Sequence, residues 1–480
     1  MTSSAFSRLD DLNRRIHAVD HAISILGADE ATHMAPGGGE DRAVSLATLS
    51  GMRHRMATAP EVADWIGEAE TEALSEEQAA ALGEFRRVHL NMTCLPAEFV
   101  ERQTHARLRC EQLWRDMRAR NDWAGFAPAL EGVVALVREE AALRAEALGL
   151  APYDALMEQY DPGARVAEIA PLLDDLGTFL TGFVPQALAA QERRLAGRPP
   201  VSLAGSYPVE KQRDLALSMM AALGFDLTHG SLSVSHHPFC GGVPSDVRIT
   251  TRYRTDEFLS ALMGVLHETG HALYEQNLPR EWAHWPLGQA RGMAIHESQS
   301  LFVEKQIGRN PAFWRWALPV VERHLGESLT LDDILPHVHR VERGLIRVDA
   351  DEVTYPLHIV LRFELERALV DGTLEVADLP EAWDEKMRAF LGLSTIDNPA
   401  DGRTLAIRPT TVQERRGHTF QEVSGICWGW HRDGAWSKYE QHHSASYEHF
   451  IERVLLPQLA AGAELRPAPQ PEDPLPTPGA

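Results

Sequence analysis

The sequence predicts a large, mainly α-helical protein that contains one small β-sheet. Three observations lead to this fold class. From residue 1 to about residue 225, apolar side chains such as Leu9, Leu12 and Ile16 recur at spacings of three and four, the period of a helix with one buried face. Strand-like alternation is confined to residues 227–253. A chain of 480 residues with 44% apolar content is long enough to bury a large core.

Proline and glycine divide the N-terminal region into separate helices, because neither residue suits a helix interior. The breaks fall at Pro36 to Gly39, Pro60, Pro96, Pro152 and Pro162-Gly163. Stretches rich in alanine, arginine and glutamate, such as residues 131–150, could be taken for coiled coil, but no heptad persists through three repeats. Ordinary packed helices without an internal repeat are therefore expected.

The short region of alternation comes immediately before the next strong helix pattern. Residues 231–235 and 247–253 alternate, and the stretch between them is rich in turn-forming residues. We expect a small antiparallel sheet here, whose edge strand could bind an extended peptide through backbone hydrogen bonds. His237 lies in the turn-rich stretch and Arg248 on the second strand. For both, an ordinary turn or surface role is as plausible as a functional one.

A long helix is expected from about residue 256 to residue 276. Thr255 is a suitable N-cap, and the two acidic residues that follow it match the positive end of the helix dipole. Asn277, shortly before a proline, provides the stop. One face of this helix is apolar, and the histidines at positions 267 and 271 point to the opposite side.

This helix contains the motif His-Glu-x-x-His at residues 267–271. Because side chains four residues apart share one face of a helix, His267 and His271 can hold the same metal ion, and Glu268 can reach a metal-activated water. The pentapeptide alone would arise by chance in about one in ten chains of this composition, so its helical setting matters. Gly270 lies inside the motif, where a bare backbone would let a substrate or a strand approach closely.

A second helix-like run, residues 293–304, supplies a third candidate ligand, Glu297. A catalytic zinc ion takes three protein ligands and keeps one position open, and two histidines with one glutamate form a known set. With His267, His271 and Glu297 together, the sequence favours a catalytic metal site over a structural zinc site or a chance match.

The composition argues against several other classes of function. The formal net charge of -23 argues against nucleic-acid and anionic membrane partners and favours a cytoplasmic protein. The cysteines lack Cys-x-x-Cys spacing, so neither a disulfide framework nor a thiolate metal site is expected; they are Cys94, Cys110, Cys240 and Cys427. No apolar run is long enough to span a membrane, and the N-terminus lacks the apolar segment of a secretory signal.

Five short motifs occur along the chain in a definite order. They are His237-Pro-Phe239, Asp246 to Thr250, His267 to His271, His296-Glu-Ser298 and Ile346 to Tyr355. In these motifs and their order the chain resembles the thermostable carboxypeptidase Taq family of zinc metallocarboxypeptidases, and its opening, residues 34–50, is similar as well. The likeness extends from about residue 10 to about residue 400.

The resemblance implies a large helical zincin-like fold with a long deep groove, whose floor holds a zinc or cobalt ion. It implies removal of C-terminal amino acids from peptide substrates with broad preference, poor action at proline, and commonly a homodimer. Residues 1–400 would form the helical carboxypeptidase domain, as two lobes around the groove, with the metal helix near 256–276. His237 and the pair Asp246 and Arg248 match motifs thought to close off the groove, which would restrict the enzyme to chain ends.

Carried over to this chain, the family's metal ligands fall on His267, His271 and Glu297. Its general base falls on Glu268. The physical chemistry agrees with these roles, because a carboxylate beside a metal-activated water can take the proton of that water and later pass it to the leaving amine.

An exopeptidase that acts at the C-terminus must also recognise a free carboxylate, which a fixed guanidinium can bind through both oxygens. We nominate Arg347, in the helix-like run 345–369, as this anchor. Tyr355 or His358 would stabilise the tetrahedral oxyanion, and Asp351 would be the hydrogen-bond partner of a ligand histidine. For each of the four, a helix-surface charge or a satisfied polar group in the core is the alternative.

The C-terminal part of the chain departs from the family pattern. After residue 402 the family has a G-x-x-Q-D-x-H-W segment, which is missing from residues 403–416 here. We interpret residues 401–455 as an atypical C-terminal segment of the same domain, and residues 456–480 as a proline-rich, disordered tail. A slipped reading frame in the gene is one explanation, and sequencing the source DNA across this region tests it.

Two functions therefore stay open. The first is an active metal-dependent carboxypeptidase. The second is a metal-binding protein with a peptide groove and little or no turnover, because the family's C-terminal motif is missing. An endopeptidase or aminopeptidase built on the same helix is a third alternative, which the order of the motifs disfavours.

Overall fold

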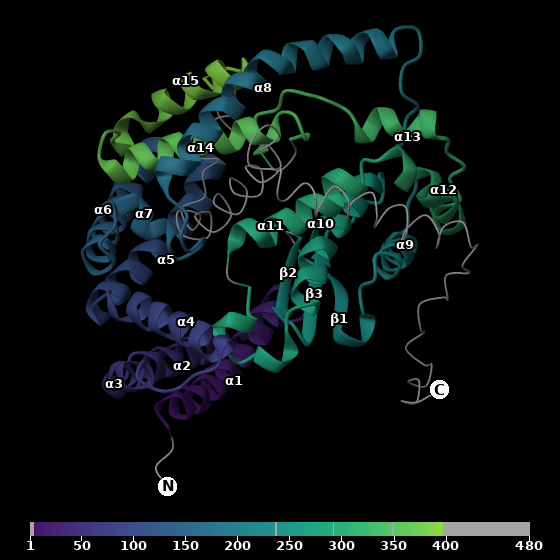
Figure 1. The fold of residues 1–480 in the computed structure, drawn as a ribbon. Helices are drawn as coiled ribbons and strands as arrows, with labels where there is room; N and C mark the ends of the chain where they lie inside the picture. The colour runs from purple at the N-terminus through teal and green to yellow at the C-terminus, as the bar shows by residue number, and fades with distance from the viewer. Residues whose placement is uncertain (1–3, 236–237, 291, 348–349, 397–480) are drawn as a thin grey trace, which may run out of the picture.

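The computed structural model describes residues 4–235, 238–290, 292–347 and 350–396. Within these ranges the protein has fifteen α-helices and one three-stranded sheet, so the predicted mainly helical fold is confirmed (Figure 1). None of the helices in the described ranges combines the length and the hydropathy that a membrane span requires. The segments 401–455 and 456–480 lie outside the described residues.

The first nine helices follow the predicted proline and glycine breaks. Pro60 and Pro152 are the first residues of their helices, where a proline sacrifices no intrahelical hydrogen bond, and Pro96 is an N-cap. These helices are α1 (Ala5–Thr32), α2 (Gly39–Ala57), α3 (Pro60–Ala69), α4 (Glu76–Thr93), α5 (Ala97–Arg120), α6 (Trp123–Leu148), α7 (Pro152–Met157), α8 (Val166–Leu195) and α9 (Val209–Ala222).

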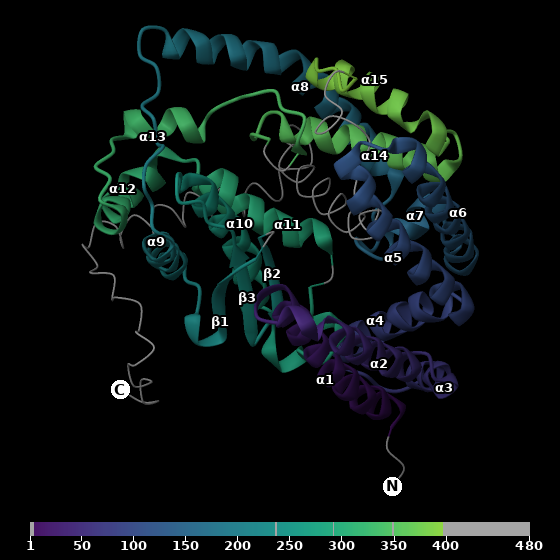
Figure 2. The same cartoon turned by 180° about the vertical axis from the view of Figure 1, so that it is seen from behind.

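Six further helices follow the sheet. They are α10 (Leu259–Gln276), α11 (Met293–Leu301), α12 (Pro311–Leu325), α13 (Leu331–Val338), α14 (Tyr355–Asp371) and α15 (Leu379–Leu391). α11 continues directly into a π-helix, η5 (Phe302–Ile307). In the ribbon α10 and α11 lie centrally, with α9, α12 and α13 on one side and α5, α6 and α7 on the other, and the reverse view agrees (Figure 1, Figure 2).

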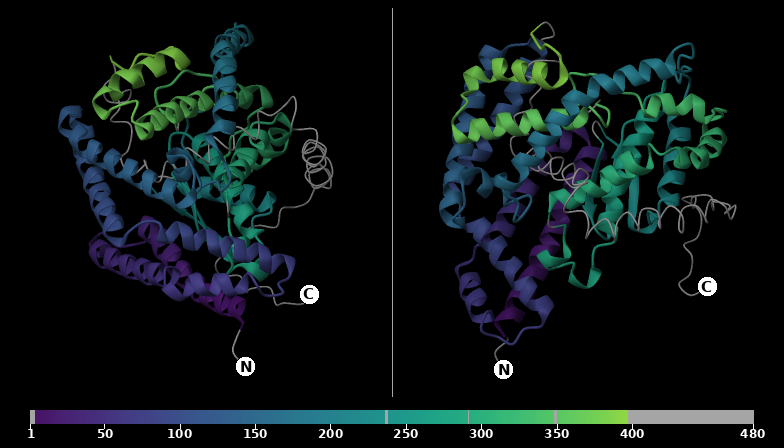
Figure 3. Two further views of the ribbon diagram at one scale, coloured as in Figure 1. Left: turned by 60° about the vertical axis from the view of Figure 1, so that its left-hand side comes forward. Right: turned by 45° about the horizontal axis from the view of Figure 1, so that its top comes forward.

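Four apolar clusters hold the described helices together. The largest joins α5, α6, α7, α8, α14 and α15, and another joins α1, α3 and α4 and includes Leu9 and Leu12. Figure 3 shows these helices from two further sides. Two clusters meet on α10: Leu262 and Leu266 pack with α9, α12 and α13, whereas Val265 packs with α9 and the sheet. Because α10 is packed on two sides, it holds its two histidines in fixed positions.

The small sheet lies against α10 and consists of β1 (Gly230–Val234), β2 (Phe239–Val243) and β3 (Asp246–Thr251). The strand order is β1-β3-β2, with β3 antiparallel to β2 and parallel to β1. The two predicted strands correspond to β1 and β3, so the prediction of an antiparallel sheet is wrong for this pair, and β2 forms in the stretch that was expected to be turn-rich. A tight turn forces β2 and β3 to run in opposite directions. β3 is thus the central strand, and it runs in the same direction as β1.

A buried ion pair within α6 is hydrogen-bonded to α5 and α4. Glu140 is fully buried, and its carboxylate accepts hydrogen bonds from Arg144 Nε at 2.8 Å and from Gln103 Nε2 at 2.7 Å. Arg144 also donates to the backbone carbonyl of Asn91 in α4, at 3.3 Å. Removing one member of a buried pair leaves the other charge without compensation, so this network should matter for stability.

We expect Glu140→Ala to lower the free energy of unfolding by about 3–5 kcal/mol, because it leaves the buried Arg144 guanidinium unpaired. The adjacent residue provides a matched control. Glu139 pairs with Arg102 at 2.6 Å on the surface, so Glu139→Ala should cost at most about 1 kcal/mol. Urea denaturation followed by circular dichroism measures both variants. Equal losses of stability would contradict the role assigned to Glu140.

Candidate metal centre

Helix α10 begins later than predicted. Its N-cap is Phe258 and not Thr255, and its end at Asn277 confirms the predicted stop. The carbonyl groups of Thr255 and Asp256 accept hydrogen bonds, at 2.8 and 3.0 Å, from backbone N–H groups of the segment before α9. Because another segment engages these carbonyls, the helical hydrogen-bond pattern can start only after them.

α11 crosses α10 at Gly270. A Cβ atom on this residue would lie 2.5 Å from Cα of Ser300 and 2.8 Å from the carbonyl carbon of Gln299. Only a glycine permits helices to approach so closely. A close approach at Gly270 was expected, but the approaching element is a helix and not a substrate or a strand. This crossing brings Glu297, which precedes Ser300 by one turn, next to α10.

Three potential metal ligands meet where the two helices cross. His267 and His271 of α10 and Glu297 of α11 offer ligand atoms that all lie within 4.8 Å of one another. Oε2 of Glu297 is 3.3 Å from Nε2 of His271 and 4.0 Å from Nε2 of His267. The described residues contain no second group of this kind. Two imidazoles and one carboxylate suit a zinc-like divalent cation, so the residues fit the predicted ion.

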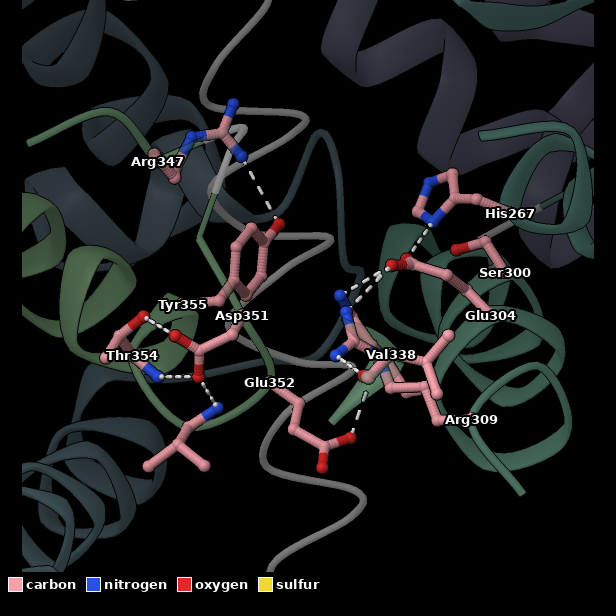
Figure 4. Close-up of polar contacts among 12 residues, drawn as sticks. His267, Ser300, Glu304, Arg309, Val338, Arg347, Asp351, Glu352, Thr354 and Tyr355 are labelled. Carbon is pink, nitrogen blue, oxygen red and sulfur yellow. Dashed lines mark hydrogen bonds and ion pairs between the residues drawn. The ribbon is translucent and has the colours of Figure 1, made fainter. Parts of the chain in front are cut away.

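Hydrogen bonds behind the two histidines orient their rings. Nδ1 of His267 lies 3.0 Å from Oε2 of Glu304, so Nδ1 carries the proton and leaves the Nε2 lone pair for a cation (Figure 4). Nδ1 of His271 lies 2.7 Å from Nδ1 of His296, whose Nε2 lies 2.7 Å from the carboxylate of Glu275. The consistent assignment has His271 donating to His296, and His296 donating to Glu275. Both ligand candidates then present Nε2 to the centre.

Burial of the centre shifts the pKa values of its ionisable groups. Burial, with Glu297 and Glu304 nearby, raises the pKa of Glu268 to about 7. Burial lowers the pKa of His271 to about 4, so this imidazole is neutral at neutral pH. Burial also disfavours the cationic form of His267, but the carboxylates of Glu297 and Glu304 outweigh it and raise the pKa to about 9. A carboxyl group that titrates near neutrality is suited to accept and return a proton.

Metal binding should depend on pH, because His267 must lose its proton before Nε2 can bind a cation. Without a cation the pKa of His267 is raised to about 9. Each ion bound below that pH therefore releases a proton, and the apparent association constant should fall about tenfold for each unit of decreasing pH between about 9 and 7. Calorimetry in buffers of different ionisation enthalpy measures the released proton. A constant affinity across this range would show that the expectation is mistaken.

Most of the chain matches a known protein family. Residues 8–403 match the family described as Carboxypeptidase Taq (M32) metallopeptidase. The chain belongs to this family. Its members are metallocarboxypeptidases, which hydrolyse peptide bonds, and the protein is an enzyme of this class.

Relatives in this family cover most of the chain. Thermostable carboxypeptidase 1 of Thermus thermophilus is 38% identical over 413 residues, which cover 82% of this chain and 79% of that protein. Carboxypeptidase 1 of Bacillus subtilis is 32% identical, with coverage of 80% and 77%. Metallocarboxypeptidase 1 of Trypanosoma cruzi superposes with a TM-score of 0.87 at 35% identity, covering 95% of this chain and 91% of the other. Pyrococcus furiosus carboxypeptidase gives a TM-score of 0.84 at 27% identity, with coverage of 96% and 90%.

Two of the residues nominated for substrate binding, Arg347 and Tyr355, lie together. Nη1 of Arg347 donates a hydrogen bond to the Tyr355 hydroxyl at 3.2 Å, and its guanidinium lies 5.8 Å from the ring centre (Figure 4). Nζ of Lys305 lies 5.6 Å from the same ring. Burial raises the pKa of Tyr355, with a further contribution from the carboxylates of Glu297 and Glu304. Tyr355 is thus within electrostatic reach of the candidate metal ligands.

The predicted helix-like run 345–369 is helical only from the start of α14. Asp351 explains the late start, because its carboxylate accepts backbone hydrogen bonds from Glu342 at 2.9 Å and from Val353 at 2.8 Å. These bonds hold the chain in a turn ahead of the helix. Arg347 consequently lies in the segment before α14 and not within that helix.

Asp351 does not have the position predicted for it. Both of its carboxylate oxygens bind groups of its own loop, and it contacts neither ligand histidine. Glu304 and His296 are the partners of these histidines instead. Asp351 is close to Arg347 in the sequence, but Glu304 is the carboxylate that contacts a histidine of α10.

His358 lies within α14 and is fully buried. Burial, together with the charges of Arg362 and Arg347, lowers the pKa of His358 to about 3, so the imidazole is neutral. Its Nε2 makes no hydrogen bond to any described residue. Its predicted role at the oxyanion stays a prediction.

Arg248 forms the predicted pair with Asp246 on β3. Two of its nitrogens lie 2.8 and 3.2 Å from the Asp246 carboxylate oxygens. Arg248 is also the register partner of Gly241 on the edge strand β2, and both strands contact α10. That this pair closes a groove stays a prediction, and His237 lies outside the described residues.

Three residues near the centre were not predicted as functional, namely Glu275, His296 and Glu304. Glu275 follows His271 by four residues, just as His271 follows His267, so helical spacing could have identified it. His296 precedes Glu297 directly, but neighbours on a helix face different ways, and its role depends on the crossing of the two helices. Glu304 belongs to a π-helix, whose geometry has no simple sequence signal.

Proposed function

We propose that the protein is an active metal-dependent carboxypeptidase that releases C-terminal amino acids from peptides with broad specificity. The proposal rests mainly on the position and burial of Glu268. It is a buried carboxylate beside two histidines that converge on Glu297, and burial raises its pKa to about 7. A structural metal site has no need for an additional carboxylate that titrates near neutrality.

The metal ligands in this proposal are His267, His271 and Glu297. A divalent cation held by them supplies a Lewis acid that polarises the scissile carbonyl and acidifies a water molecule. Three protein ligands also leave room for a small molecule beside them, as hydrolysis requires. Glu304 and His296 keep the imidazoles turned towards this position.

Glu268 is the proposed general base. Its carboxylate accepts a proton from the attacking water while the water oxygen bonds to the substrate carbonyl carbon. The same group returns this proton to the amine nitrogen as the peptide bond breaks. A pKa near neutrality serves both steps, because neither transfer is then strongly uphill.

Arg347 is the proposed anchor for the free carboxylate of the substrate, because a planar guanidinium can donate to both of its oxygens. Since Arg347 donates to the oxygen of Tyr355, the phenolic proton of Tyr355 is available to the oxyanion that develops on the substrate. His358, His237 and Arg248 are further proposed substrate-binding residues. The support for His237 and Arg248 is the family motifs, and His358 is proposed as an alternative to Tyr355 at the oxyanion.

A second candidate function is a metal-binding protein with a peptide groove and little or no turnover. The observation that favours it is the absence of the family's G-x-x-Q-D-x-H-W segment from residues 403–416. If that segment contributes to the family's active site, its loss would leave the metal ligands intact while reducing the rate. Metal binding and turnover must therefore be measured separately.

The deciding experiment compares blocked dipeptides that end in a free carboxylate with the same peptides ending in an amide, after loading with zinc or cobalt. We expect release of the terminal amino acid from the free acids only, loss of release with a chelator, and recovery with added metal. Metal binding without release would favour the second candidate. Internal cleavage or release from the N-terminus would reject carboxypeptidase action.

We further propose zinc or cobalt as the ion, a homodimer as the assembly, and the cytoplasm as the location. The ion and the dimer rest on the family resemblance, and the location rests on the net charge of -23. Metal analysis and light scattering of the purified protein test the first two, and cell fractionation tests the third.

A further inference from the structure

Two carboxylates face opposite sides of the His267 ring. Oε2 of Glu297 is 4.0 Å from Nε2 of this imidazole, and Oε2 of Glu304 is 3.0 Å from Nδ1. The carboxylates come from consecutive segments, α11 and the π-helix η5. π-helical turns are rare and often occur at functional sites. The ring is therefore fixed between one carboxylate at the candidate metal position and another behind it.

The two oxygens of Glu304 have different partners. Oε1 lies 2.5 Å from Nζ of Lys305. It also lies 3.8 Å from Nη2 of Arg309, whereas Oε2 faces His267 (Figure 4). The side chains of Glu304, Lys305 and Arg309 are 13–14% exposed, so this charge group is largely shielded from water. Two permanent cations on one oxygen orient the carboxylate, and they leave the other oxygen to accept a hydrogen bond from the imidazole.

We propose that Glu304 is a positioning residue for the metal centre, and that Arg309 ties Glu304 to the loop that carries Arg347. By accepting the Nδ1 proton, Glu304 holds His267 in the tautomer whose Nε2 lone pair faces the cation, and it makes that nitrogen a better ligand. The part of this proposal that concerns Arg347 rests on the proposed function; the part that concerns the metal does not.

Arg309 joins the metal side of the molecule to the segment 338–352. Its Nη1 donates to the carbonyl of Val338 at 2.7 Å, and its Nε lies 3.8 Å from the carboxylate of Glu352 (Figure 4). Its own carbonyl accepts a hydrogen bond from Nε2 of His339 at 2.6 Å. These contacts lie at both ends of the loop that contains Arg347.

The distance between the anchor and the metal ligands matters in a carboxypeptidase. The terminal carboxylate and the scissile bond of the substrate are separated by one amino acid, so the anchor and the metal ligands must keep a constant separation. Misplacement by about 1 Å can cost about a hundredfold in rate. Arg309 contacts both the carboxylate behind His267 and the backbone that leads to Arg347, and it can therefore set this separation.

Glu304→Gln tests the metal side of the proposal, because glutamine keeps the size and an acceptor oxygen but removes the charge. We expect the metal affinity, measured by competition with a chelator, to fall about 10- to 100-fold. The visible absorption spectrum of the cobalt-loaded protein should change as well, because the orientation of the His267 ring is less well fixed. An affinity and a spectrum equal to those of the unsubstituted protein would overturn the proposal. Neither readout depends on turnover, so an inactive enzyme still gives a decisive result.

Two companion variants separate positioning from general damage. Glu322→Gln removes the same charge from an exposed residue of α12 and should leave the metal affinity unchanged. Glu304→Asp keeps the charge on a shorter side chain and should recover part of the lost affinity. If Glu304→Asp and Glu304→Gln lose affinity equally while both unfold at the unsubstituted temperature, the charge of Glu304 has no positioning role.

Arg309→Met tests the link to the loop. We expect KM for peptides with a free carboxylate, or Kd where turnover is absent, to rise about tenfold or more, because Arg347 is no longer held at its distance from the metal ligands. In the double variant Arg309→Met with Glu304→Gln, the fold loss of metal affinity should be smaller than the product of the fold losses in the two single variants. The reason is that Arg309 acts on the metal centre through the Glu304 carboxylate. Unchanged peptide and metal binding, with only a lower unfolding temperature, would reject the link.

Discussion

Replacing Glu268 by glutamine is expected to lower kcat for peptide hydrolysis by about 10²- to 10⁴-fold while metal stays bound. Glutamine has nearly the same shape but cannot take a proton from water. The neighbouring ligand candidates, His267 and His271, keep their contacts with Glu304 and His296, so the metal affinity should change little. Steady-state kinetics on a blocked dipeptide, with metal analysis of the same sample, measure both quantities.

The control for this variant is Glu281→Gln, because Glu281 is an exposed carboxylate shortly after α10. It should retain full activity. If Glu268→Gln kept more than about a tenth of the activity, another group would have to be the general base. If it lost metal and activity together, Glu268 would act as a ligand or as a support for the centre.

The same substitution should affect stability in a pH-dependent way. Burial raises the pKa of Glu268 to about 7, above its unfolded value, so the folded state binds a proton more readily than the unfolded state. The stability that the protonated form contributes is therefore lost as the pH rises through about 7. In metal-free protein, Glu268→Gln should raise the unfolding temperature more at pH 8 than at pH 5. An equal effect at both values would mean that Glu268 titrates normally.

Helix α10 could be predicted from the sequence because its signals are local. The apolar spacing, the His-Glu-x-x-His motif and the stop at Asn277 belong to one stretch, and helix geometry alone puts His267 and His271 on one face. Glu297 could be found only by asking which third donor a metal requires. Nothing within its own segment indicates that α11 will cross α10 at Gly270.

The sheet and the start of α10 depend on contacts between distant segments. Alternation identifies strands, but it does not specify which strands pair, and β1 pairs with β3 although β2 lies between them in the chain. Thr255 has the chemistry of an N-cap, yet its carbonyl is engaged by a backbone N–H before α9. In both cases tertiary contacts overrode a correct local preference.

The partners of the ligand histidines were the least predictable part of the site. Asp351 and Glu304 are both carboxylates close to candidate site residues in the sequence, so residue type does not distinguish them. The backbone of its own loop binds Asp351, whereas the π-helix directs Glu304 to His267. Side-chain direction depends on backbone geometry, and this geometry was not encoded in a recognisable motif.

Gly270→Ala is expected to destabilise the protein and to weaken metal binding together. The added Cβ would lie 2.5 Å from Cα of Ser300, and because this neighbour is backbone, α11 would have to move. Overpacking of this kind costs about 1–3 kcal/mol, which exceeds the gain of about 1 kcal/mol from replacing a helical glycine by alanine. Any shift of α11 also moves Glu297 away from the two histidines, so we expect the metal affinity to fall at least about tenfold.

Gly264→Ala on the same helix separates these effects. A Cβ on Gly264 would meet its nearest neighbours at 3.8 and 3.9 Å, which is ordinary contact. This variant should therefore gain up to about 1 kcal/mol of stability and bind metal normally. Urea denaturation and chelator competition measure both properties in both variants. If Gly270→Ala behaved like Gly264→Ala, the two helices would not depend on a bare backbone at their crossing, and the placement of Glu297 would need another cause.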